Sequence, residues 1–201
     1  MMNVPAFTFT IVKVISFTVP FFTGSKNAFS NIVFVPVISV PFAFLIEKAT
    51  RYDIRGKKYI NTPFKYYFAD LGLRNARLNF RQSEKSHLME NLIYNELRIR
   101  GFNVDIGVVP VIIKDNEGKQ QRIQLEVDFV CNLGSRRYYI QSAFRMETDE
   151  KIKQERASLL KVDDSFKKII VLGEETPILR DEDGITTIGI YDFLLKDNSL
   201  E

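Results

Sequence analysis

A short apolar run near the C-terminus constrains the fold of this 201-residue chain more than any other feature. Between Lys168 and Leu172, the residues Ile169, Ile170 and Val171 follow one another without polar alternation. Such a run is typical of a strand that is buried on both faces of a sheet. Both faces of that sheet therefore need a covering layer, which helices elsewhere in the chain would provide.

The segments around this run alternate between helical and extended patterns. Apolar residues of Ser86–Arg100 fall mostly at helical spacing, and Gly101 supplies a stop. Thr148 is suited to cap a second helix that runs to about Lys161. Other expected segments are strands at Asn103–Val111, Arg122–Val130, Arg137–Ser142 and Ile185–Ile190, a polar turn at Asp115–Gly118 and a short helix at Tyr191–Leu195. This order predicts an α/β fold in which a mixed sheet is flanked by helices.

A β-hairpin is expected before the first of these helices. Asp53–Gly56 has the composition of a tight turn between Phe44–Tyr52 and Lys57–Ile60, with Gly56 at a position of positive φ. The next residues, Asn61-Thr62-Pro63, are expected to break the second strand, and extended structure resumes at Lys65.

Residues 1–43 differ in composition from the rest of the chain. Of the 28 basic residues only Lys13 and Lys26 precede Glu47, and none of the 25 acidic residues does. Prolines and Lys13 interrupt each apolar stretch, which disfavours a membrane helix, and the start lacks the basic residues of a signal peptide. Extended segments are the better local prediction. The alternative is that a truncated or frame-altered gene produced this segment, and that the native domain starts near Phe44.

Cysteine and histidine usage narrows the chemistry. A single cysteine, Cys131, excludes an internal disulfide and suits the reducing cytoplasm. With His87 as the one histidine, a zinc site of the usual Cys/His type is also excluded. We expect His87 to be a surface residue and Cys131 to behave as a small apolar side chain.

Three polar residues on separate elements are candidates for a catalytic site. Glu90 lies on the expected helix, Asp128 on one strand and Gln141 at the end of the next. Glu126 and Asp128 share one face of their strand, because side chains alternate along a strand. Hard cations such as Mg²⁺ prefer carboxylate oxygens from neighbouring elements, so Glu90 and Asp128 are the candidate metal ligands. For Glu126, pairing with a nearby base is the default expectation.

An ordered set of segments resembles one prokaryotic family. The segments are Phe44–Ile46, Tyr52–Gly56, Lys65–Arg74, Leu88–Asn91 with Glu96–Leu97, and Glu126–Val130. Together they are similar to the C-terminal domain (domain of unknown function 4143) of AAA-type ATP-binding proteins, over about residues 44–195. That domain is similar to PD-(D/E)xK nucleases, so the resemblance implies a restriction-endonuclease-like fold. It implies a wing-like hairpin connection at 44–80 and a nuclease-like domain at 81–201.

The resemblance also implies which residues would form the nuclease site. Glu90 matches the helix acid and Asp128 the metal-binding aspartate, whereas Gln141 stands in place of the second acid and Ala143 in place of the lysine. Loss of an acid weakens cation binding, and loss of the lysine removes charge stabilisation at the phosphate. We therefore expect a degenerate site. Candidate replacements for the lysine are Arg145, Lys151 and Lys153.

A basic and aromatic cluster on the hairpin suggests a second kind of contact. Arg51, Arg55, Lys57 and Lys58, followed by Lys65, are interleaved with tyrosines. That combination can bind phosphate backbones and stack on bases, although a solvated hairpin with aromatic packing is the commoner structure.

Three functions remain open on the sequence. The first is a non-enzymatic module that binds nucleic acid, or a protein partner, for an ATPase. The second is a Mg²⁺-dependent nuclease with a relocated lysine, and the third a truncated product without an independent role. The ATPase domain that the resemblance implies would need a G-x-x-x-x-G-K-[ST] loop, for which Thr23–Lys26 is no substitute, so no ATPase activity is expected.

Overall fold

The computed structural model describes residues 45–201 except 82–83 and 115–117. The chain divides into two units, residues 1–36 and 37–201, and everything below concerns the second. The expectations for residues 1–43 lie outside the described residues, as does most of the polar turn expected at Asp115–Gly118.

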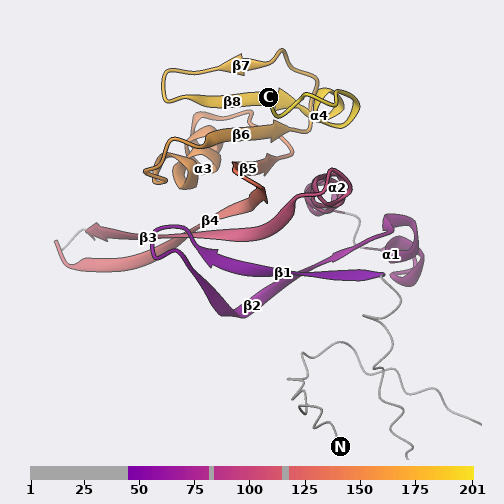
Figure 1. Cartoon of the computed structure of the whole chain (residues 1–201), viewed down its shortest axis with the longest axis horizontal. Coiled ribbons are helices and arrows are strands. Elements are labelled where there is room, and N and C mark those ends of the chain that lie inside the picture. Colours follow the sequence, from indigo (N-terminus) through magenta and orange to yellow (C-terminus); the bar gives the residue numbers. More distant parts are fainter. Residues whose placement is uncertain (1–44, 82–83, 115–117) are drawn as a thin grey trace, which may run out of the picture. The chain divides into compact units, whose positions relative to one another are not determined.

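An eight-stranded mixed sheet organises this part of the chain (Figure 1). Its order is β2-β1-β3-β4-β5-β6-β8-β7, with parallel pairing in β1/β3, β5/β6 and β6/β8 and antiparallel pairing in the others. The strands are β1 Ile46–Asp53, β2 Lys58–Phe68, β3 Asn103–Lys114, β4 Gln120–Leu133, β5 Arg136–Ala143, β6 Lys167–Leu172, β7 Leu179–Arg180 and β8 Ile185–Gly189. The predicted mixed sheet flanked by helices is confirmed.

Helices cover both faces of the sheet. The helices are α1 Leu71–Arg77, α2 Lys85–Ile99, α3 Asp149–Leu160 and α4 Ile190–Leu195. Buried residues of α2 and α4, such as Leu97 and Phe193, share one core cluster with Phe129. Leu159 of α3 belongs to a second cluster with Val127 and Tyr139. The two clusters are therefore the layers on opposite faces of the sheet.

The apolar run that predicted this architecture forms β6, a strand inside the sheet. Ile169, Ile170 and Val171 are at most 1% exposed, as the sequence pattern predicted. Consecutive residues of β6 point to opposite faces, so Ile169 joins the α2 layer and Ile170 the α3 layer. Each such burial contributes about 1.5–3 kcal/mol of favourable free energy.

Two short elements were not expected from the sequence. No residue of α1 is buried, and β7 is two residues long and exposed. Neither element carries an apolar period, so no pattern indicated them. By contrast, the cap expected at Thr148 is present, because its side-chain oxygen accepts a hydrogen bond from the backbone of Lys151.

The expected hairpin forms and joins the sheet through β1, but its turn differs in detail from the prediction. The positive φ falls on Lys57, at +50°, and not on Gly56. A side chain at position 56 is disfavoured for a different reason. The Asp53 carboxylate accepts a hydrogen bond from the Gly56 backbone nitrogen at 2.8 Å, and a Cβ at Gly56 would overlap that carboxylate.

The expected break at Asn61–Pro63 was wrong as a strand boundary. β2 continues from Lys58 to Phe68, and the irregularity appears in its pairing with β1. Arg51 pairs with Ile60 while Ala49 pairs with Lys65, so several residues of β2 lie opposite one residue of β1. Pro63 is tolerated because β2 is an edge strand, whose outer side needs no backbone donor.

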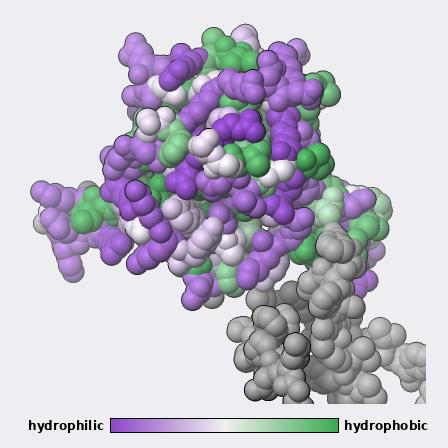
Figure 2. All heavy atoms as spheres, viewed as in Figure 1, coloured by the Kyte–Doolittle hydropathy of each residue, from purple (hydrophilic) through white to green (hydrophobic). Residues whose placement is uncertain are grey.

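The face of the molecule seen in Figure 2 is covered mainly by hydrophilic side chains, with apolar ones scattered among them. In the described part of the chain, no helix is both long enough and apolar enough to cross a membrane.

Candidate functional site

The site residues on β4 and β5 meet where these two strands stop pairing. Their last pair at this end is Phe129 with Ile140. On the other side, the register between β3 and β4 shifts, so that Asp128 and Phe129 together lie opposite Ile106. This bulge re-aims the Asp128 side chain toward β5, a common role of bulges near functional sites.

Hydrogen bonds join Asp128 of β4 to Gln141 and Ser142 of β5. The Asp128 carboxylate accepts from the backbone nitrogen of Ser142 at 2.8 Å, and the Asp128 backbone nitrogen donates to Gln141 Oε1 at 3.3 Å. The structure therefore brings Asp128 and Gln141 together on neighbouring strands.

Lys65 of β2 lies at the centre of the acidic residues. Its ammonium nitrogen is 2.9 Å from Glu90 Oε1, 2.7 Å from Glu126 Oε1 and 3.9 Å from Asp128 Oδ1. Glu90 is thus brought to Asp128 through this shared cation.

Two further groups complete this set of interactions. The hydroxyl of Tyr67 donates to Glu90 at 2.6 Å. The guanidinium of Arg51 lies 2.6 Å from the second carboxylate oxygen of Glu126, which confirms the expected pairing of Glu126 with a base. Glu90, Glu126 and Asp128 are therefore all compensated by protein groups. We call Lys65 and these three carboxylates the lysine-centred site.

The protonation of this site follows from burial and from its charges. Burial by itself lowers the pKa of Lys65, but the negative charges of Glu90, Glu126 and Asp128 outweigh it, so the pKa is raised. Lys65 therefore carries its charge at neutral pH. Burial, together with the charge of Glu90, raises the pKa of Asp128 to about 7, despite the opposing effects of Lys65 and the Ser142 backbone.

Gln141 is held in place by side chains of helix α3. Its amide nitrogen donates to Glu155 of α3 at 3.2 Å, and its oxygen accepts from Ser158 at 3.4 Å. Glu155 is in turn paired with Lys151 at 2.6 Å. The amide thus bridges Asp128 and α3 with both of its ends engaged.

Ala143, where the predicted resemblance requires a lysine, is part of the core. Ala143 is 1% exposed and belongs to the α3-side cluster, with Leu159 and Ile170. The expected replacements are also outside the lysine-centred site. Arg145 pairs with Glu147 and Glu174, Lys151 pairs with Glu155, and Lys153 is exposed on α3.

Lys65 was missed as a site residue, because the sequence placed it in the basic cluster of the hairpin. A signal for it does exist in the strand alternation. Lys65 and Tyr67 are two residues apart and therefore lie on the same face of β2. Tyr67 is 5% exposed, so that face is turned toward the core.

A polar cavity of about 370 Å³ opens beside the site. Its lining consists of acids, amides, hydroxyls and one leucine: Ser86, Glu90, Gln124, Leu125, Glu126, Asp128, Gln141, Ser142, Gln154, Glu155 and Ser158. No group of three or more His, Cys, Asp or Glu in the described residues is arranged to hold a metal ion. The residues do not fit a Mg²⁺ ion at the candidate ligands Glu90 and Asp128, because the Lys65 ammonium already lies among these carboxylates.

The basic residues of the hairpin divide into two groups. Arg51 is engaged by Glu126, and Arg55 donates to the carbonyls of Pro110 and Lys161 and lies 3.3 Å from Asp163. Lys57 and Lys58, by contrast, are exposed. Of the four residues of the expected nucleic-acid surface, Arg51 and Arg55 are thus held in contacts within the fold, and Lys57 and Lys58 present their ammonium groups to solvent.

His87 and Cys131 behave as expected. His87 is exposed and lies 3.2 Å from Glu84, one turn earlier. Cys131 is fully buried, and burial raises the pKa of its thiol.

Comparison with known proteins finds a relative without a described activity. Over 157 residues, 77% of this chain, the sequence is 34% identical to an uncharacterized protein of Haemophilus influenzae. The match covers 34% of that protein, so the chain spans about a third of the relative's length. No family model matches the chain, and no solved structure matches it. The resemblance to the C-terminal domain of ATP-binding proteins therefore stays a prediction.

Proposed function

We propose that residues 45–201 form a catalytically silent, nuclease-like module that acts by binding nucleic acid or a protein partner. The observation that carries this proposal is the position of Lys65, whose ammonium lies between Glu90, Glu126 and Asp128. A tethered ammonium in that position compensates the carboxylates that would otherwise attract a divalent cation.

The other parts of the site support the same conclusion. Gln141 adds no negative charge, and its amide is already bonded to Glu155 and Ser158. Ala143 leaves no side chain that can stabilise charge on a phosphate, and it faces the core. A metal-dependent hydrolase needs an open cation site and a group that activates water. Neither function is provided by the residues of the nuclease pattern.

We further propose that the module serves a larger ATP-binding protein. The relative is about three times as long as the segment that matches it, which leaves ample length for another domain. The sequence resemblance implies that such a domain is a P-loop ATPase. In that arrangement this module would bind the nucleic acid or protein partner, and the ATPase domain would hydrolyse ATP.

Metal titration tests whether the lysine-centred site binds a divalent cation. Calorimetric titration of the purified chain with Mg²⁺, Mn²⁺ or Ca²⁺ is expected to show no saturable binding. Lys65→Met is expected to gain binding, because three carboxylates then lose their common cation. Lys58→Met, on the exposed part of the same strand, is the matched control and is expected to behave as the original chain. Saturable Mg²⁺ binding to the unmodified chain would contradict the proposal.

A second candidate function is a Mg²⁺-dependent nuclease in which Lys65 is the relocated lysine. The proximity of its ammonium to both Glu90 and Asp128 favours it. This candidate predicts metal-dependent cleavage of single- or double-stranded DNA that disappears in Lys65→Met and in Asp128→Ala. The silent module predicts no cleavage by any of the three proteins, so the two candidates separate in one assay.

A further inference from the structure

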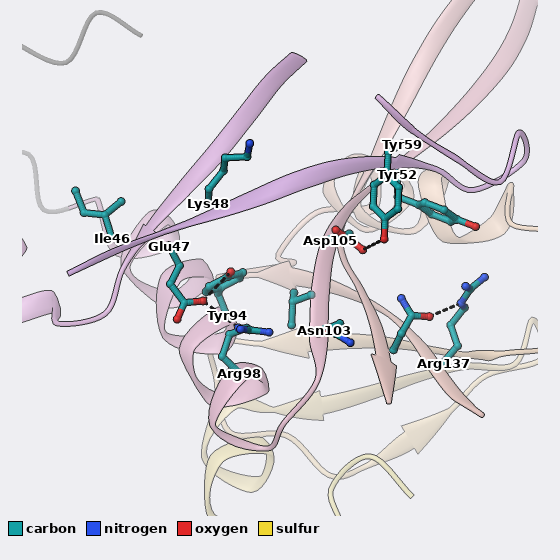
Figure 3. A pocket seen from close by; sticks show the side chains of 12 residues that line it. Ile46, Glu47, Lys48, Tyr52, Tyr59, Tyr94, Arg98, Asn103, Asp105 and Arg137 are labelled. Carbon is teal, nitrogen blue, oxygen red and sulfur yellow. Dashed lines mark hydrogen bonds and ion pairs between the residues drawn. The ribbon is translucent and has the colours of Figure 1, made fainter. Parts of the chain in front are cut away.

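We propose that a second cavity of the molecule binds a nucleotide unit, that is, a flat base with its phosphate. This cavity has a volume of about 850 Å³ and lies among β1, β2, β3, α2, the end of β4 and the start of β5 (Figure 3). The lining residues that matter for the argument are Tyr52, Tyr59, Tyr94, Arg98, Asp105 and Arg137. None of its residues lines the cavity beside the lysine-centred site.

The acids of this cavity are already satisfied by protein groups. Glu47 pairs with Arg98 at 2.9 Å and also accepts from the hydroxyl of Tyr94. Asp105, 8% exposed, accepts hydrogen bonds from Thr50 and from the hydroxyl of Tyr59. Figure 3 shows the Glu47–Arg98 pair on one side of the cavity and Asp105 with Tyr59 on another. Arg98 therefore compensates the charge of Glu47, whereas Asp105 keeps its negative charge with its hydrogen bonds satisfied by hydroxyl groups.

Two cations at the same cavity have no such compensation. Arg137 donates to the neutral amide of Asn132 at 2.7 Å, and no ion pair joins it to a carboxylate of the described residues. The Lys48 ammonium lies 3.8 Å from the centre of the Phe64 ring and likewise has no ion pair in that part of the chain. Three cations of the lining, Lys48, Arg98 and Arg137, thus outnumber the two acids, Glu47 and Asp105, and this excess of positive charge favours an anion.

Aromatic rings beside Arg137 give the cavity a flat-ligand character. Tyr52 and Tyr59 meet edge to face, with ring centres 5.4 Å apart. The guanidinium of Arg137 lies 5.6 Å from the Tyr52 ring and 5.4 Å from the Phe166 ring. Tyr59 is 63% exposed, so much of its ring remains available to a partner. Any of the nucleobases can stack on such a ring, because each has a flat π-face, and the adjoining guanidinium suits a phosphate.

This combination distinguishes a nucleotide from other anions. An acidic peptide would use Arg137 and Lys48 but would gain little from the exposed ring of Tyr59. Duplex nucleic acid keeps its bases stacked inside, so it would also leave the ring unused. The amides of Asn103 and Asn132 line the cavity and offer both donors and acceptors for the edge of a base.

The nucleotide cavity names a ligand class for the proposed binding role and rests on that role, but it does not depend on whether the lysine-centred site is silent. The residues involved differ from those of the lysine-centred site. Binding measurements in EDTA are therefore independent of whether any metal binds at Lys65. A nuclease at the lysine-centred site and a nucleotide cavity elsewhere can each succeed or fail alone.

Fluorescence anisotropy of the full chain tests the inference. The probe is a fluorescein-labelled 12-residue oligothymidylate in low salt with EDTA, and unlabelled duplex and AMP serve as competitors. Tyr59→Ala is expected to weaken oligonucleotide binding by about 5–100-fold, the range for loss of one stacked base. Tyr59→Phe keeps the ring and is expected to bind nearly as tightly. Tyr191→Ala is the matched control, because Tyr191 of α4 is 62% exposed.

A second variant addresses the phosphate contact. Arg137→Gln is expected to weaken binding and to lower the salt dependence of log K by about one counterion. Thermal unfolding of this variant separates lost binding from lost folding, and Tyr59→Ala decides the matter if Arg137→Gln is unfolded. Strong competition by AMP identifies a free nucleotide as the ligand, and weak competition identifies single-stranded nucleic acid.

Several outcomes would overturn the inference. These are no binding of the labelled oligothymidylate, equal effects of Tyr59→Ala and Tyr191→Ala, and duplex competing as well as the single strand. Displacement of the oligonucleotide by polyglutamate at similar concentration, with no effect of Tyr59→Ala, would instead identify a site for acidic proteins.

Discussion

The ammonium nitrogen of Lys65 lies 2.9 Å from Glu90 Oε1, although 25 residues separate the two in the sequence. One residue belongs to the edge strand β2 and the other to helix α2. The same nitrogen reaches Glu126 on β4 at 2.7 Å. A single side chain thus joins three elements of the fold, and it partly compensates the negative charge of Glu90, Glu126 and Asp128.

Lys65→Met is expected to lower the free energy of unfolding by about 2–4 kcal/mol at pH 7, because it leaves partly buried carboxylates uncompensated. Chemical denaturation measures the loss. Adding Glu90→Gln to this variant is expected to recover part of it, since one of the unpaired charges is then removed. A loss no greater than that of Lys58→Met would show that the cation is not needed for stability.

Asp128→Asn is expected to change how stability depends on pH. The pKa of Asp128 is about 7 in the folded protein, above the usual value of 3.8. Between about pH 4 and pH 7 the folded state holds a proton that the unfolded state has lost, so ionisation of Asp128 reduces stability as pH rises. Asparagine does not titrate, and its oxygen can still accept from Ser142.

The stability of Asp128→Asn relative to the original chain should therefore increase as pH rises from 4 to 7 and level off above 7. Each unit of pKa shift corresponds to about 1.4 kcal/mol, so the total change is a few kcal/mol at most. Urea denaturation across this pH range measures it. A difference that stays constant with pH would mean that the carboxyl has an ordinary pKa.

Gln141→Glu is expected to destabilise the fold at pH 8 by about 1–3 kcal/mol, because a second carboxylate would then face Glu155. The Gln141 amide nitrogen now lies 3.2 Å from that residue. The like charges raise the pKa of the pair, so the loss should shrink as the pH falls and one carboxyl gains a proton. Gln121→Glu, on the exposed end of β4, is the control. Equal effects of the two substitutions at pH 8 would argue against the contact.

Gly56→Ala is expected to cost about 1–2 kcal/mol, because the new Cβ would overlap the Asp53 carboxylate that accepts the Gly56 N–H. The same substitution in an Asp53→Ala background should cost much less, and thermal unfolding of the four proteins tests this. Equal costs in both backgrounds would assign the effect to the backbone of the turn.

Local patterns in the sequence were sufficient for most elements of the sheet and its helices. The run at Ile169–Val171 predicted a doubly buried strand, and the spacing of apolar residues predicted α2. Thr148 was recognised as a cap because its role depends only on residues next to it. The short elements α1 and β7 were missed, since neither buries an apolar face that would leave a period in the sequence.

The sequence was enough to predict the uncharged residues of the candidate site, but not that Lys65 would lie at its centre. Gln141 and Ala143 can be read directly, because a neutral amide and a methyl group lack the charges that the predicted resemblance requires at these positions. The meeting of Asp128 with Gln141 was also expected from neighbouring strands, and it is confirmed by their hydrogen bond. The bulge that re-aims Asp128 left no clear signal, since it depends on how β3 and β4 pair.

By itself, the sequence determined that this chain forms a mixed sheet between helices, and that Gln141 and Ala143 stand where the predicted nuclease resemblance would require an acid and a lysine. Those properties reside in periodicity and in single residues, which local chemistry is enough to interpret. Only the tertiary structure decided that Lys65 lies among Glu90, Glu126 and Asp128. The pairing of β1 with β3 brings the hairpin into the sheet, and the charge balance of the site depends on that long-range contact.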